Sequence, residues 1–128
     1  MRNRLIIGTL LATTVLALAR PLLAAPEEGA VVAHGRCSGA SIWEMTMKPD
    51  IGLEMEAHLE TGVPDQEWHL RMSYDGNVFF ETTEVTEEDG GFEVANGQRN
   101  LVGWDRFELS AINVQTGERC VGGVKAEL

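Results

Sequence analysis

The chain has few basic residues, few cysteines and no long apolar run, and each shortage excludes a class of protein. Its 128 residues include 10 Lys and Arg against 20 Asp and Glu, a formal net charge of −10. Such an acidic chain repels phosphate backbones, which excludes nucleic acid as a partner. The one extended apolar stretch, Leu5 to Ala19, is shorter than the roughly 20 residues that span a bilayer.

That stretch predicts a secretory signal peptide. Arg2 and Arg4 precede it, and small residues follow around Ala24, which is the order of regions in an export signal. We expect cleavage after Ala24, with cleavage after Ala19 or an uncleaved anchor as alternatives. The organisation is then a signal peptide over 1–24, a flexible lead over 25–30 and one domain over 31–128. The mature chain is secreted, with a net charge of −13 and no stable membrane insertion.

The two cysteines, Cys37 and Cys120, lie near the two ends of the mature domain. In an exported chain an isolated pair is expected to form a disulfide. The alternative, two free thiols for redox or metal chemistry, is disfavoured because there is no Cys-x-x-Cys pair and because export is oxidising.

Period-two alternation predicts seven or eight short strands and no helix. Leu53 to Leu59 is the clearest case, with Leu53, Met55, Ala57 and Leu59 on one face and charged residues on the other. Tight turns are expected at 49–52 and at Asp75-Gly76, and a polar loop at 96–100. The other strands are expected over 31–37, 41–48, 67–74, 77–85, 92–94 and the two arms of a closing hairpin that turns at 115–117. The fold class is therefore an antiparallel β-sandwich.

The run Phe107-x-Leu109-x-Ala111-x-Asn113, followed by a turn and a last strand, resembles the penultimate strand of fibronectin type III and immunoglobulin-like domains. Trp68 is similar to the core tryptophan of immunoglobulin domains. The chain also looks like the small exported single-domain proteins of actinobacteria. The resemblance implies a recognition or structural module. The chain departs from the immunoglobulin pattern because its cysteines lie near the chain ends, not on central strands.

No catalytic motif is present. The chain lacks a Gly-x-Ser-x-Gly elbow, a His-Glu-x-x-His pair, a phosphate loop and a dinucleotide fingerprint. We therefore expect a protein that is not an enzyme and that carries no cofactor, with a hydrolase lacking a recognisable motif as the third reading.

Metal binding is the second reading. His58 and His69 fall on outer faces of strands that we expect to be neighbours, where they could form a weak copper site of a periplasmic or extracellular carrier. The methionines fall on inner faces, where methionine is ordinary core filler. The acidic turn Glu87, Glu88 and Asp89 offers oxygen ligands for calcium but lacks the EF-hand spacing, so a solvated turn is favoured.

Binding to an unidentified protein or envelope partner is the first reading. Phe79 and Phe80 are adjacent, so we expect them to point to opposite faces, one of them exposed. Ile112 and Val114 lie on the face opposite Phe107. Together these four residues predict an apolar patch for a partner. The expected role is thus non-catalytic: binding or structure in the cell envelope or the medium.

The export prediction is tested by native mass spectrometry of protein recovered from the medium without reductant. We expect a chain that starts at Ala25, lighter by two hydrogens and free of metal. A stoichiometric copper adduct lost on mutation of His58 and His69, or a calcium adduct lost on mutation of the acidic turn, would contradict the binding-module reading.

Overall fold

The computed structural model describes residues 28–128. The predicted signal peptide and its cleavage site lie outside the described residues. Within 28–128 no helix is long and apolar enough to cross a membrane.

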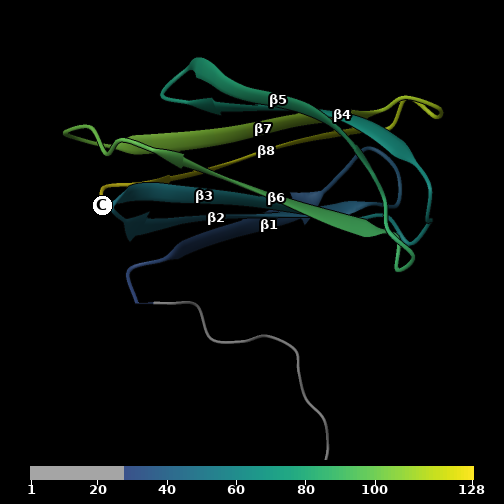
Figure 1. Cartoon of the computed structure of the whole chain (residues 1–128), viewed down its shortest axis with the longest axis horizontal. Helices are drawn as coiled ribbons and strands as arrows, with labels where there is room; N and C mark the ends of the chain where they lie inside the picture. Colours follow the sequence, from purple (N-terminus) through teal and green to yellow (C-terminus); the bar gives the residue numbers. More distant parts are fainter. Residues whose placement is uncertain (1–27) are drawn as a thin grey trace, which may run out of the picture.

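Eight antiparallel strands form two four-stranded sheets that face each other, which confirms the all-β sandwich (Figure 1). The first sheet has the order β1-β2-β3-β6 and the second the order β5-β4-β7-β8. Their bounds are β1 Val31–Arg36, β2 Ile42–Asp50, β3 Gly52–Glu60, β4 Glu67–Tyr74, β5 Asn77–Val85, β6 Gly91–Gln98, β7 Asp105–Asn113 and β8 Arg119–Ala126.

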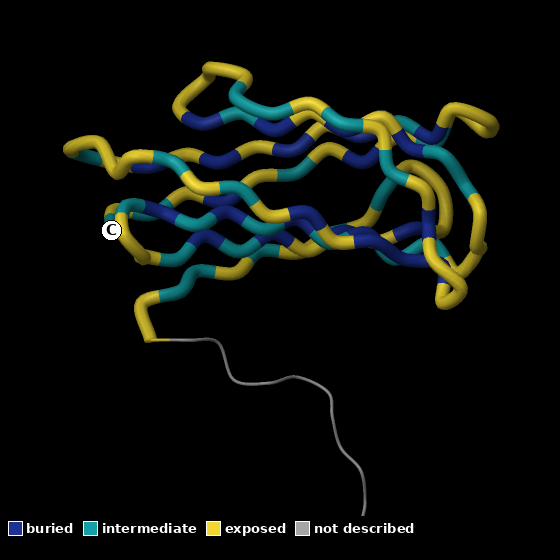
Figure 2. The backbone as a smooth tube through the Cα atoms, viewed as in Figure 1, coloured by how far each residue is buried: buried dark blue, intermediate teal, exposed yellow. Residues whose placement is uncertain are grey.

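The core lies between the sheets and follows the predicted alternation. On β3 every second residue from Leu53 to Leu59 is buried, and β4 and β7 repeat the pattern (Figure 2). Burial of one face per strand is what drives two sheets together. The largest fully buried apolar side chains are Trp68, Phe107, Met45, Met47, Leu53, Met55, Leu59, Leu70, Met72 and Leu109.

Two predicted boundaries are wrong, and in both cases strand pairing explains the difference. The polar loop expected over 96–100 is strand as far as Gln98, because residues 96–98 pair with β3. The turn expected over 49–52 tightens to Ile51, since Asp50 and Gly52 are already paired. The Asp75-Gly76 turn is confirmed, with φ of 50° and 87° at its two residues.

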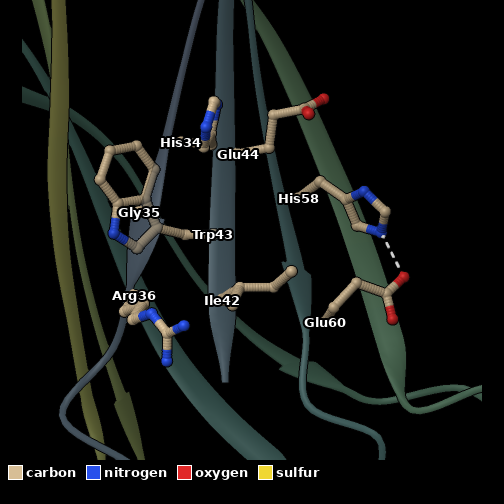
Figure 3. Close-up of a pocket in the computed structure, with 8 residues that line it drawn as sticks. All are labelled: His34, Gly35, Arg36, Ile42, Trp43, Glu44, His58 and Glu60. Atoms are coloured by element: carbon tan, nitrogen blue, oxygen red, sulfur yellow. Dashed lines mark ion pairs between the residues drawn. The ribbon is translucent and has the colours of Figure 1, made fainter. Parts of the chain in front are cut away.

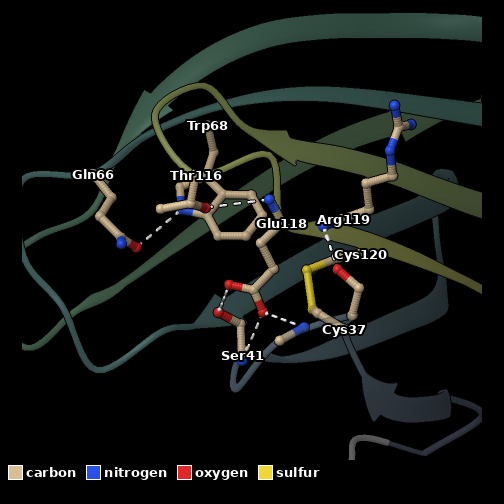
Figure 4. Close-up of a disulfide and its surroundings, with 10 residues drawn as sticks. Cys37, Ser41, Gln66, Trp68, Thr116, Glu118, Arg119 and Cys120 are labelled. Carbon is tan, nitrogen blue, oxygen red and sulfur yellow. Dashed lines mark hydrogen bonds between the residues drawn. A yellow bond between two sulfur atoms is a disulfide. The ribbon is translucent and has the colours of Figure 1, made fainter.

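One open side of the sandwich is closed by β1 and β8, the edge strands of the two sheets. Cys37 follows β1 and forms a disulfide with Cys120 of β8 (Figure 4). The predicted pairing is therefore present, and it ties the two ends of the domain together.

The turn after β1 is also held by hydrogen bonds to Glu118 and Arg119, where β8 begins. The Glu118 carboxylate accepts bonds from the Gly39 N–H at 3.0 Å, the Ser41 N–H at 2.9 Å and the Ser41 hydroxyl at 2.9 Å. The Arg119 N–H donates to the Ser38 hydroxyl at 2.9 Å. Bonds that involve an ionised acceptor are stronger than neutral ones, so Glu118 adds a second fixing point beside the disulfide (Figure 4).

The Trp43 indole fills the space between β1 and β8 because both strands have a glycine there. A Cβ added at Gly35 would lie 2.7 Å from Trp43 Cζ2, and one added at Gly122 would lie 2.4 Å from the same atom. No real Cβ contact is this short, so any larger residue would displace a buried indole.

We expect Gly122→Ala to lower the free energy of unfolding by about 2 kcal/mol, because an extra carbon in a filled core forces rearrangement. Equilibrium urea unfolding measures the change. Gly97→Ala on β6 is the matched control, since its Cβ would meet only Leu53 O at 3.7 Å. Equal stabilities for the two variants would contradict the tight packing at this edge.

Candidate functional site

A partly open pocket of about 650 Å³ lies on the outer face of the first sheet (Figure 3). Three adjacent strands build it, and each contributes two side chains that point away from the core; the buried Trp43 indole, a core residue, also borders the pocket. Its lining consists of His34, Gly35, Arg36, Ile42, Trp43, Glu44, His58 and Glu60.

Strand register places these side chains in two rows. In the first row Glu44 of β2 pairs with His34 of β1 on one side and with His58 of β3 on the other. In the second row Ile42 pairs with Arg36 and with Glu60 in the same way. Directly opposed residues on one face of a sheet lie close enough to interact. The pairing thus gathers two imidazoles, two carboxylates, a guanidinium and an isoleucine.

The pocket combines polar groups with an exposed apolar floor. His58 Nε2 lies 3.0 Å from Glu60 Oε1, and the Ile42 side chain is 51% exposed. Among the described residues that line the pocket, none carries a hydroxyl, thiol or amine nucleophile. This arrangement can exchange hydrogen bonds and charge with a ligand and cover an apolar group, which are binding roles.

His58 and His69 are not neighbours, so that expectation is wrong. The chain crosses from one sheet to the other between β3 and β4, which puts His58 in the first sheet and His69 in the second. His69 pairs with Thr83 and Ile112 instead. This removes the geometric basis of the two-histidine copper site. Over residues 28–128 no group of three or more His, Cys, Asp or Glu is placed to hold a metal.

Sequence reasoning missed His34, the histidine that shares a row with His58. The signal was present: His34, Glu44 and His58 all fall on outer faces of three consecutive strands. The burial pattern and the turns between those strands together set the register, and the sequence does not predict those turns closely enough to align the three positions.

The acidic turn is a compact hydrogen-bonded loop between β5 and β6. Glu87, Glu88 and Asp89 are all exposed. The Asp89 carboxylate accepts the Gly91 N–H at 2.9 Å, and the Gly90 N–H donates to Glu87 O at 2.8 Å. The Asp89 carboxylate therefore caps the turn, and Glu87 contributes its backbone carbonyl to these bonds.

The predicted apolar patch does not exist as one surface. A β-bulge opposite Met72 and Ser73 breaks the alternation of β5, so Phe79 and Phe80 both pack against the core. The expectation that they point to opposite faces is wrong for this reason. Ile112 does lie on the outer face of the second sheet, beside His69, and Val114 is exposed just beyond β7.

A buried polar pair lies at the end of the sandwich away from the disulfide. The Tyr74 hydroxyl donates to the Asp105 carboxylate, and both residues are buried. The Leu101 N–H donates to the Tyr74 oxygen at 3.2 Å, and the Leu128 N–H donates to Asp105 Oδ2 at 3.3 Å. This pair fixes the β6–β7 loop and the chain's last residue to the second sheet.

Comparison with protein-family models, with curated proteins and with solved structures finds no match for the chain. The geometry alone therefore carries the functional argument.

Burial, together with the hydrogen bond to Asp105, raises the pKa of Tyr74 to about 12, from an ordinary value of 10.0. The folded protein thus holds this proton more tightly than the unfolded chain does. We expect stability to be intact below pH 10 and to fall as the pH rises toward 12. Tyr74 is the chain's only tyrosine, so tyrosinate absorbance reports it directly.

The native protein should titrate near pH 12 and the urea-unfolded protein near pH 10. Tyr74→Phe should remove the absorbance change and weaken the loss of stability over the same interval. A native midpoint near pH 10 would contradict the buried pair.

Proposed function

We propose that this chain is an exported, non-catalytic β-sandwich module that binds a partner through the pocket on the outer face of the first sheet. The observation that carries the proposal is the double row of side chains that strand register gathers on β1, β2 and β3. A buried disulfide is in keeping with an oxidising, extracytoplasmic environment.

We further propose that the sandwich is of the fibronectin type III kind. The second sheet places the β4–β5 hairpin beside the β7–β8 hairpin, with β4 paired to β7. The buried Trp68 stands on β4, one of the two central strands of this sheet. The disulfide joins edge strands and not the centres of the sheets, which argues against the immunoglobulin kind.

The pocket's chemistry suits a polypeptide or another ligand that carries both charge and an apolar group. Arg36 is an exposed fork of donors that fits a carboxylate. Glu44 and Glu60 accept from cationic or hydroxyl groups, and Ile42 covers an apolar segment. A binding role needs these groups and no more, since charged and apolar contacts suffice to hold a ligand.

Photo-crosslinking in the organism that makes the chain tests this proposal. A photoreactive phenylalanine analogue replaces Ile42 in one variant and Val121 in the other; Val121 is 68% exposed on the outer face of the second sheet. We expect a discrete crosslinked partner from position 42 alone, identified by mass spectrometry. We also expect Arg36→Glu to reduce its yield about tenfold, since a charge-assisted hydrogen bond is lost and a like charge is added.

Equal crosslinking from the two positions would contradict a specific site on the first sheet. The absence of crosslinks from position 42, with the protein folded and exported, would overturn the proposed binding role of the pocket.

A further inference from the structure

The end of the sandwich opposite the disulfide displays apolar side chains on two neighbouring loops. Val102 is fully exposed, Trp104 is 60% exposed and Leu101 is 48% exposed, all in the β6–β7 loop. Ile51, in the β2–β3 turn, is 99% exposed. A pocket lined by Ile51 and by residues 97–100 shows that the two loops are adjacent. Figures 1 and 2 show the β6–β7 loop projecting from this end as an exposed tip.

The base of this loop is fixed, which keeps its tip in solvent. The Leu101 N–H donates to the Tyr74 hydroxyl oxygen at 3.2 Å, and Asn100 Nδ2 donates to Leu128 O at 3.0 Å. Gly103 has a φ of 99°, a conformation that favours glycine and turns the chain between Val102 and Trp104. The tip is therefore an ordered apolar projection and not a loose segment that could fold back.

Basic and acidic side chains both lie near the tryptophan, since Asp75 and Glu108 line the same pocket as Trp104, Arg106 and Lys125. Lys125 Nζ lies 5.3 Å from the centre of the Trp104 ring, and Lys125 pairs in register with Arg106 of β7. Arg99 begins the same loop. These are three of the seven Lys and Arg residues in the described part of a strongly acidic chain. Apolar side chains with a tryptophan and cations beside them are what a membrane interface selects, because the rings lie at headgroup level and the cations meet phosphates.

The direction of the chain points to the same end. β1 begins here, since Val31 pairs with Met47 and a Cβ on Gly29 would lie 3.1 Å from Pro49 Cγ. The described chain therefore enters the fold at the same end as the exposed β6–β7 loop.

We propose that this end, which we call the apolar tip and define as Ile51, Leu101, Val102 and Trp104, docks peripherally on a phospholipid surface. Val102 and Trp104 enter the interface, and Lys125, Arg106 and Arg99 contact lipid phosphates. The pocket of the first sheet stays free, because it lies toward the Cys37–Cys120 end. This goes beyond the proposed binding function, and either proposal can fail without the other.

The test is vesicle binding by the exported, disulfide-bonded protein, with its N-terminus established by mass. The vesicles contain phosphatidylcholine and phosphatidylglycerol at two to one. Trp104 is the reporter, because Trp43 and Trp68 are buried. We expect a blue shift of its emission on vesicle addition, and quenching when the phosphatidylcholine carries bromine on its acyl chains. Val102→Asp should weaken binding about tenfold or more, since a carboxylate replaces an inserted apolar group.

Val121→Asp is the matched control, an exposed valine on β8 away from the tip, and should bind vesicles like the parent. Absence of sedimentation with vesicles would overturn the proposal, as would binding that Val102→Asp and Val121→Asp weaken equally. Concentration-dependent self-association that Val102→Asp abolishes, without vesicle binding, would replace the bilayer with a second copy of the chain as the occupant of the tip.

Discussion

The structure depends most on the closure of its open side, where β1 of one sheet meets β8 of the other. The Cys37–Cys120 bond, the Glu118 carboxylate and the Trp43 indole all act at this seam. Edge strands present unpaired backbone groups and few core contacts, so they are the first to separate. A covalent bond between the two edges, with an indole filling the space between two glycines, keeps β1 in the fold.

The candidate binding site depends on the same closure. His34 and Arg36 stand on β1, and the rest of the pocket stands on β2 and β3. Within residues 28–128, β1 is hydrogen-bonded to a neighbouring strand on one side, to β2, so the seam with β8 is what completes its fixation. The two cysteines and the two glycines therefore hold β1 in place. Because β1 is fixed, its side chains stay aligned with those of β2 and β3 in the double row on the outer face. The apolar tip lies at the other end and is fixed separately, through Tyr74 and Asp105.

The sequence was most informative where a pattern is local. Alternation from Leu53 to Leu59 predicted the buried face of β3, and Asp75-Gly76 predicted the turn between β4 and β5. Both signals lie within a few residues of the chain. The oxidising environment expected for an exported chain predicted the disulfide between its two cysteines. Predictions failed where distant segments decide. His58 and His69 are apart because β4 belongs to the second sheet and β3 to the first. Phe79 and Phe80 both pack against the core because a β-bulge interrupts the alternation of β5. To predict the row of His34 and His58, the register across two turns would have to be known. To predict the exposure of the apolar tip, the whole fold would have to be known.

The most direct test of this account is the free energy of unfolding of the oxidised protein against that of the double variant Cys37→Ala, Cys120→Ala, measured by urea denaturation. The bond closes a loop over a sequence separation of 83 residues. We predict a loss of about 4 kcal/mol on the chain-entropy model, with hydrogen exchange accelerated first in β1. Equal stability of the two proteins, with β1 exchanging no faster than β3, would contradict the claim that the β1–β8 seam holds the structure together.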